Sequence, residues 1–426
     1  MNRYKSKIAK IFASDFNKQF SILLSGSIIS QAIPLVASIF LARIYDPKDF
    51  GILALFNGIC VMLIPFSSLR YEFAISLAKK EIDAIAISLL STIIAFLISA
   101  ILFFFFFFFK DYILSILDAQ SLRRWILYVP LVVFLGAFYN ILRNYSLRHK
   151  QIKVIAFSNT LKSVVGSGFQ LLLGQLGFLK AGLIVGTILS NFFGNLKMLK
   201  FFLKNRKLMN SVRKERIIYN AIKYKEFPLV SSWGVLLNSA SVSLNNFFIS
   251  SLYGLNQLGF YSYSFRYLNM PLSLVSSNLG QLLFQVCAEN IREKKDSRPI
   301  FLSTLKKIII VSTPFFLVLY FSVEYIFVLV FGAKWLFSGT IAKVLIPMFY
   351  FRMIYSPLST IAVAFEKQRL FFFMQLGILI ANVVPFVFAY VLNKELMFFM
   401  KIYSLGSSIL FILLTYLLYL VVAKRL

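Results

Sequence analysis

The chain contains a series of apolar stretches, each about 20 residues long, separated by short polar segments. A helix of that length spans roughly 30 Å of hydrocarbon, and its backbone groups bond to one another, as lipid requires. The composition agrees, with 59% hydrophobic and 14% charged residues, and the period-2 alternation of a membrane barrel is absent. The sequence therefore predicts an all-α integral membrane protein.

We predict twelve transmembrane helices. The predicted spans cover 20–42, 51–69, 84–109, 124–143, 154–177, 180–200, 227–250, 258–284, 307–331, 338–363, 370–392 and 398–422. The first span is too long for the apolar region of a signal peptide, and LARIYDPKDFG follows it where a small-residue cleavage site would be needed. We expect this span to stay in the membrane.

The basic residues are distributed asymmetrically along the chain. Of 45 Lys and Arg, 32 fall on one side of the predicted topology and nine on the other. This bias is the positive-inside pattern, and it predicts that both termini lie in the cytoplasm. The net charge of +29 could also indicate nucleic-acid binding, but the spans leave no soluble domain to carry a basic groove.

The N-terminal segment 1–19 contains five basic residues and apolar residues at helical spacing. These apolar residues are Ile8, Ile11, Phe12 and Phe16. The pattern fits a short interfacial helix on anionic lipid, and an ordinary frayed tail is the alternative.

Two segments 208 residues apart resemble each other: FLARIYDPKDFGILAL, from Phe40, and FISSLYGLNQLGFYSY, from Phe248. The paired positions are Phe40 with Phe248, Tyr45 with Tyr253, and Gly51 with Gly259. Apolar sequences also align by chance. A true repeat predicts two parallel six-helix bundles related by an axis along the membrane normal, with substrates bound between them.

On this basis the chain divides into five predicted regions. They are a cytoplasmic N-terminal segment (1–19), a first bundle (20–200), a basic cytoplasmic linker (201–226), a second bundle (227–422) and a cytoplasmic C-terminus (423–426).

Arg266 is the most informative intramembrane residue. It lies about eight residues into the eighth predicted span, roughly 12 Å deep and close to the bilayer midplane. A charge there costs about 2.5–3.5 kcal/mol and usually faces a bundle interior or wet cavity. Asn269 continues the same helical face, and Tyr263 lies one turn above. The alternative is a structural cation that satisfies backbone carbonyls.

Other polar residues repeat this pattern in neighbouring spans. Asn238 and Asn245 share a face of the seventh span, and Gln31 belongs to a polar stripe on the first. Such residues either line a cavity or bond helices together.

Four further charges lie inside predicted spans, and one of them, Lys343, is close enough to the outer end of the tenth span to extend to the membrane interface. Arg352 lies midway along the tenth span, whereas Lys162 is close enough to one end of the fifth to reach the interface. Glu324 is the main carboxylate inside a span, either interfacial or a coupling residue. The cations outnumber it, so we expect a positive cavity for an anionic ligand, with arginine matched to phosphate oxygens.

The inventory gives no basis for catalysis. The chain has one histidine and two cysteines, too few for a metal-ligand cluster, and no cofactor is implied. The predicted outer loops are also too short for a catalytic domain, so a membrane glycosyltransferase or polymerase is disfavoured. We expect a transporter.

The segments SLRYEFAISLAKKEIDA and LGFYSYSFRYLNMPLSLVSSNLGQLLFQVCAE resemble the bacterial polysaccharide flippases. These are the Wzx-type exporters of O-antigen or capsule repeat units, in the multidrug/oligosaccharidyl-lipid/polysaccharide exporter superfamily. The resemblance covers nearly the whole chain. It implies twelve helices in two six-helix bundles around a central cavity, alternating access, and location in the bacterial inner membrane.

The resemblance also implies a ligand and its contacts. The family's substrate is an oligosaccharide on undecaprenyl pyrophosphate, and cationic cavity residues hold the pyrophosphate. That role passes to Arg266, and less strongly to Arg70, Lys162 and Arg352. Membrane lipids, a polysaccharide polymerase and a chain-length regulator are the implied partners. A small-molecule exporter of the same fold is the alternative, and it would require an essential carboxylate such as Glu324.

Overall fold

The computed structural model describes residues 28–116, 119–293, 295–365 and 367–423. The predicted N-terminal segment 1–19 and residues 424–426 lie outside these ranges. The described part of the chain consists of helices and the turns between them, without a strand. The prediction of an all-α protein is therefore confirmed.

The chain forms two compact units. Unit 1 comprises Met1–Tyr45, Phe56–Ser115 and Gln120–Ser239, and unit 2 comprises Asp46–Leu55, Ile116–Ala119 and Ala240–Leu426. The start of the second helix, α2, thus packs with unit 2 although its remainder packs with unit 1. The division into two six-helix bundles stays a prediction.

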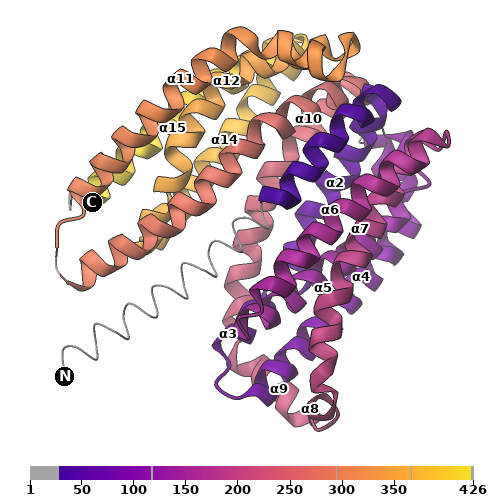
Figure 1. Cartoon of the computed structure of the whole chain (residues 1–426), viewed down its shortest axis with the longest axis vertical. Helices are drawn as coiled ribbons and strands as arrows, with labels where there is room; N and C mark the ends of the chain where they lie inside the picture. The colour runs from indigo at the N-terminus through magenta and orange to yellow at the C-terminus, as the bar shows by residue number, and fades with distance from the viewer. Residues whose placement is uncertain (1–27, 117–118, 294, 366, 424–426) are drawn as a thin grey trace. The chain divides into compact units, whose positions relative to one another are not determined.

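Unit 1 contains most of the helices of the first half of the chain (Figure 1). They are the helix Ile28–Ile44, α2 (Pro47–Ser67), α3 (Ala74–Leu77), α4 (Glu81–Ile116), α5 (Val129–Arg148), α6 (Ile152–Gln175), α7 (Leu179–Phe202), α8 (Arg206–Asn210) and α9 (Lys214–Lys223). Helices α6 and α7 pack against each other and run side by side. The Tyr45 hydroxyl lies between them and donates a hydrogen bond of 2.6 Å to the carbonyl of Gln170.

Unit 2 is built from the remaining helices (Figure 1). They are α10 (Ser232–Arg292), which begins in unit 1, α11 (Arg298–Phe331), α12 (Leu336–Leu358), α13 (Thr360–Ala364), α14 (Gln368–Val391) and α15 (Leu396–Val422). Helix α12 packs against both α11 and α15, and α14 packs against α15.

Helix α10 covers what the sequence predicts as two spans and a loop. Its only non-helical residue is Gly254, with φ 80° and ψ 172°. Glycine adopts positive φ at little cost because it lacks a Cβ atom, so one residue makes the break. The predicted loop between 250 and 258 is therefore a kink at one glycine.

Eight helices among the described residues are long and apolar enough to cross a membrane, and a shorter apolar helix covers Ile28–Ile44. The protein is thus a multi-pass membrane protein, whereas the count of twelve spans stays a prediction. The phenylalanine run 103–109 on α4 is exposed at every position except Phe106. In a multi-pass membrane protein, an exposed apolar surface of this kind suits contact with lipid.

Two glycines bring the backbones of α2 and α10 into direct contact within unit 2. A Cβ atom on Gly51 would lie 1.8 Å from the carbonyl oxygen of Leu255, and one on Gly259 would lie 1.7 Å from that of Pro47. Pro47 and Leu255 are also 208 residues apart, so the two contacts are reciprocal under the offset of the repeat. This geometry supports the pairing of Gly51 with Gly259.

We expect Gly51→Ala and Gly259→Ala each to destabilise the protein by about 1–3 kcal/mol, because the added methyl group cannot fit without separating the helices. Gly406→Ala is the matched control, since a Cβ atom there meets nothing within 4 Å. Apparent melting temperatures of the purified full chain in detergent provide the measurement. Equal melting temperatures for all three variants would contradict the close packing of α2 and α10.

Candidate substrate-binding site

Arg266 lies on α10 in unit 2 with an exposed side chain. No carboxylate in the described part of the chain forms an ion pair with it. Its guanidinium group therefore has no acidic partner among the described residues, and its place in a cavity stays a prediction. The same face of α10 carries Asn269, which is half-buried.

Arg352 lies on α12, next to the turn of α10 that contains Arg266. Its guanidinium carbon is 5.8 Å from the ring centroid of Phe265 and 5.9 Å from that of Phe349. The centroids of the two phenylalanine rings are 5.2 Å apart, so these rings join α10 to α12 beside Arg352. Arg352 also has no carboxylate partner among the described residues. Unit 2 thus contains two uncompensated arginines on adjoining helices.

Tyr263 and Asn245 have structural contacts in unit 2. The ring of Tyr263 is buried, stacks on Trp335 at 4.0 Å and meets the edge of Phe50 at 4.9 Å. The amide of Asn245 is also buried and donates a hydrogen bond of 3.3 Å to Asn382. Both side chains join helices, so their contacts with a substrate stay predictions.

Glu324 is neutralised by a lysine on the neighbouring helix. Its carboxylate on α11 lies 2.7 Å from the ammonium group of Lys343 on α12, and each side chain is 33% exposed. The sequence predicts that Lys343 extends to the membrane interface, and the structure adds this acidic partner. The carboxylate is engaged in a local ion pair.

The remaining candidates on membrane helices lie in unit 1. Lys162 on α6 is half-buried, and its ammonium group is 4.9 Å from the ring centroid of Tyr139. Its aliphatic stem packs on α7, where a Cβ atom at Gly194 would lie 3.2 Å from the stem. Gln31 is half-buried on the helix Ile28–Ile44. The side chain of Asn238 lies outside the described part of the structure.

Arg70 occupies a tight turn after α2 in unit 1. It has φ 63°, and Leu69 before it has φ 48°, a left-handed backbone that is costly for residues other than glycine. The guanidinium carbon lies 3.8 Å from the ring centroid of Phe73, and the Nε atom is buried without a partner. Burial lowers the pKa of Arg70, and the nearby Glu72 partly offsets this effect.

Glu72 supports the same turn from inside unit 1. Its side chain is 1% exposed, and its carboxylate accepts a hydrogen bond of 2.6 Å from the Ser68 hydroxyl. Burial raises the pKa of Glu72, whereas the Ser68 hydrogen bond and the charge of Arg70 lower it. The segment Arg70–Glu72, which belongs to one of the two stretches that carry the family resemblance, therefore has a structural role of its own.

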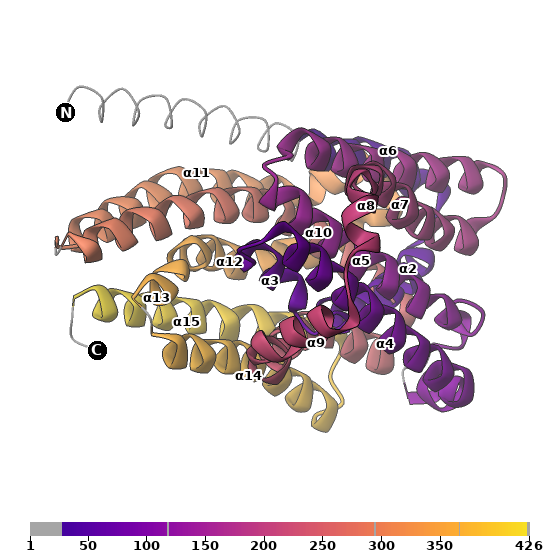
Figure 2. The same ribbon diagram turned by 90° about the horizontal axis from the view of Figure 1, so that it is seen from below.

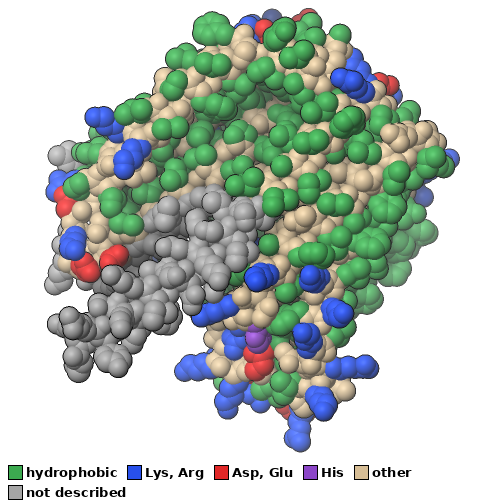
Figure 3. All heavy atoms as spheres, viewed as in Figure 1, with side chains coloured by type: hydrophobic (Ala, Val, Ile, Leu, Met, Phe, Trp, Pro, Cys, Tyr) green, Lys and Arg blue, Asp and Glu red, His purple; other side chains and the backbone are tan. Residues whose placement is uncertain are grey.

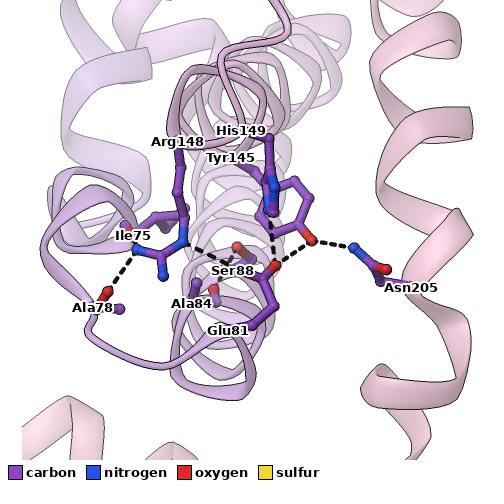
Figure 4. A network of polar contacts seen from close by, with 9 residues as sticks. All are labelled: Ile75, Ala78, Glu81, Ala84, Ser88, Tyr145, Arg148, His149 and Asn205. Atoms are coloured by element: carbon purple, nitrogen blue, oxygen red, sulfur yellow. Dashed lines mark hydrogen bonds and ion pairs between the residues drawn. The ribbon is translucent and has the colours of Figure 1, made fainter. Parts of the chain in front are cut away.

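The structure also shows a polar network that the sequence analysis missed (Figure 4). At the first turn of α4, the carboxylate of Glu81 accepts hydrogen bonds from the Tyr145 hydroxyl at 2.6 Å and from Arg148 Nε at 3.3 Å. It also contacts His149 Nε2 at 2.9 Å. Arg148 donates to two carbonyls at the end of α3, those of Ile75 (3.1 Å) and Ala78 (2.6 Å).

This network joins α3, α4 and α5. It lies at the end of unit 1 that contains Lys79, Lys80, Arg148 and Lys150, which we call the basic end. Its sequence signal is the motif KKEID at residues 79–83, in which two carboxylates stand within a basic segment. Acidic residues are common in the first turn of any helix, so the motif alone does not reveal the partners. Nothing in the network requires a ligand.

Comparisons with known proteins place these features in a family. A family model described as polysaccharide biosynthesis protein matches residues 40–340. A teichuronic acid biosynthesis protein of Bacillus subtilis, TuaB, is 24% identical over 178 residues, which are 42% of this chain and 37% of that protein. The chain thus spans little more than a third of the length of this relative.

Two solved structures have the same fold. An inward-facing multidrug resistance transporter of the MATE family, in the MOP superfamily, superposes with a TM-score of 0.72 at 13% identity, covering 95% of this chain and 98% of that one. The lipid II flippase MurJ, in an inward closed conformation, gives a TM-score of 0.70 at 15% identity, covering 95% and 87%. At these identities the likeness shows the fold alone.

We expect Glu81→Ala to destabilise unit 1 by about 1–2 kcal/mol, because it removes charge-assisted hydrogen bonds. The Glu81 side chain is 31% exposed, so water screens these bonds and keeps the expected loss small. The apparent melting temperature of the purified chain measures the loss. Glu289→Ala, at an exposed position on α10, is the control and should leave that temperature unchanged. If Glu81→Ala and Glu289→Ala behave alike, the Glu81 network does not stabilise the fold.

Proposed function

The chain belongs to the family of polysaccharide biosynthesis proteins, and from this we propose that it is a flippase for lipid-linked saccharides. Its substrate would be an oligosaccharide repeat unit on undecaprenyl pyrophosphate. The protein would move this substrate across the bacterial inner membrane by alternating access, for O-antigen or capsule biosynthesis. Both termini would lie in the cytoplasm, as the bias of basic residues predicts.

The observation that carries this proposal is the pair of uncompensated arginines in unit 2. Arg266 and Arg352 lie on adjoining helices, and Phe265 and Phe349 occupy the contact between those helices. Two cations without a carboxylate partner favour an anionic ligand, and guanidinium groups bind phosphate oxygens in a bidentate manner. A pyrophosphate carries enough charge and oxygen atoms to engage both.

The other candidates take supporting parts in the proposal. Lys162 and Arg70 in unit 1 would contact the pyrophosphate at another stage of transport, since neither has a carboxylate ion pair among the described residues. Amide and hydroxyl side chains suit the sugar hydroxyls. The residues proposed for this role are Gln31, Asn238, Asn245, Tyr263 and Asn269.

The alternative function, export of small molecules by the same fold, is less well supported. Such an exporter would couple transport to an essential carboxylate, and Glu324 is the candidate from the sequence. Its ion pair with Lys343, at 2.7 Å, gives the carboxylate a structural partner on the next helix. The site therefore supports a flippase better than a small-molecule exporter.

We expect Arg266→Ala and Arg352→Ala each to reduce surface glycan by at least about tenfold in a strain that depends on this protein, because each removes a charge-assisted contact with the ligand. Arg369→Ala, at an exposed position on α14 in the same unit, is the matched control. Surface glycan is measured at equal protein abundance. Wild-type glycan levels in both arginine variants would contradict the proposed pyrophosphate site.

We expect Glu324→Gln to leave glycan export within about twofold of wild type, since the proposed mechanism needs no carboxylate on α11. The double variant Glu324→Gln/Lys343→Met removes both partners and controls for an unpaired lysine. Loss of export in both variants, at normal protein abundance, would favour coupling through this carboxylate and the exporter alternative.

A further inference from the structure

A basic cavity lies at the end of unit 1, between the first turn of α4 and the amphipathic helix α9. Its volume is about 770 Å³. Five cations line it, together with two carboxylates, those of Asp83 and Glu215. The cations are Lys79, Lys80, Arg213, Arg216 and Lys223. Figure 3 shows Lys and Arg gathered over α8 and α9 at this end of the unit.

Only one of the five cations is paired within the described structure. Arg216 Nε lies 2.7 Å from the carboxylate of Asp83, which also accepts a hydrogen bond of 3.2 Å from Asn220. The other four form no ion pair with a described carboxylate. The cavity therefore has a net positive charge that the surrounding protein leaves uncompensated.

Helix α9 is held in place by one of its faces. Asn220 is buried against Asp83, and the Tyr71 hydroxyl donates a hydrogen bond of 2.9 Å to the carbonyl of Ala221. These contacts attach α9 to α4 and to the turn that follows α2. Figure 2 shows α9 beside the end of α4. The helix is thus a docked element with a defined orientation.

The exposed side of α9 carries three large apolar residues, with Glu215 at its N-terminal end. Ile218, Tyr219 and Ile222 are 48%, 60% and 63% exposed, and the two isoleucines are one turn apart. An amphipathic helix with basic flanks and an apolar face lies in the plane of a membrane interface. The lining of the cavity includes Tyr219, so cations and apolar surface adjoin.

We propose that this cavity binds the headgroup of an anionic phospholipid, with the acyl chains of that lipid against the apolar face of α9. The ligand must be anionic at one end and apolar at the other, because the four cations without an ion pair in the described structure line the cavity together with Tyr219, which shares the exposed side of α9 with Ile218 and Ile222. A soluble anion leaves the apolar face exposed, whereas a phospholipid satisfies both parts. This inference is independent of the proposed flippase activity, since it concerns a site outside the arginines of unit 2.

Native mass spectrometry of the purified full chain, with phosphatidylglycerol or phosphatidylcholine added, tests the proposal. The wild-type protein should bind phosphatidylglycerol at least about tenfold more tightly than phosphatidylcholine. The triple variant Lys79→Ala/Arg213→Ala/Lys223→Ala should lose this preference. Arg216 is left intact because its contact with Asp83 holds α9.

The matched control is Lys204→Ala/Arg206→Ala/Lys207→Ala. These three exposed residues lie just before α9, outside the cavity, and their removal changes the net charge equally. The control should retain the preference for phosphatidylglycerol, as should Lys79→Arg/Arg213→Lys/Lys223→Arg. Equal loss in the control and the cavity variant, or no preference in the wild type, would overturn the proposal.

Two further measurements separate a lipid from other anions. Soluble pyrophosphate should not displace phosphatidylglycerol, and displacement would instead assign the cavity to a free phosphate compound. A spin label on Ile222→Cys, with both native cysteines buried, should be more accessible to oxygen than to a water-soluble nickel reagent in phosphatidylglycerol vesicles. Greater accessibility to nickel would place α9 in water and refute the lipid contact.

Discussion

The close approach of two backbones at Gly51 and Gly259 is the contact that attaches the start of α2 to α10 in unit 2. Helices in lipid gain little from the hydrophobic effect, so close van der Waals contact must hold them together. Here each glycine meets the carbonyl of the residue four positions before the other, Leu255 for Gly51 and Pro47 for Gly259. Because α2 continues from this contact into unit 1 and α10 begins there, both helices of the contact belong to both units.

Charged side chains are paired at the basic end of unit 1, around the first turn of α4, whereas two arginines on α10 and α12 of unit 2 are not paired in the described structure. At the basic end of unit 1, Glu81 and Asp83 each bind an arginine, and these ion pairs fasten α5 and α9 to α4. In unit 2, Arg266 and Arg352 lack such partners in the described structure. The paired charges therefore fasten helices, and the two unpaired arginines of unit 2 are those that we propose for the ligand. The same reasoning separates Glu324, which Lys343 binds, from a free coupling carboxylate.

The sequence predicts what hydropathy controls and misses what depends on tertiary contacts. The all-α membrane fold follows from apolar stretches, and the pairing of Gly51 with Gly259 follows from the weak repeat. The kink at Gly254 is missed because a single residue with positive φ leaves no hydropathy signal. The burial of Tyr263 depends on Phe50 and Trp335, which come from distant parts of the chain. The partners of Glu81 are also distant in sequence, between 64 and 68 residues away.

The basic residues of this chain then have two physical roles that the net charge alone does not separate. A positive-inside bias requires only that cations stand on one side, wherever they lie on that surface. In unit 1, five basic residues are instead concentrated around one cavity beside α9. One side of α9 is held by contacts of Asn220 and Tyr71, and the other side exposes apolar residues. Orientation of the chain does not explain this placement. A bound anionic lipid does, because its headgroup and its acyl chains need both surfaces at once.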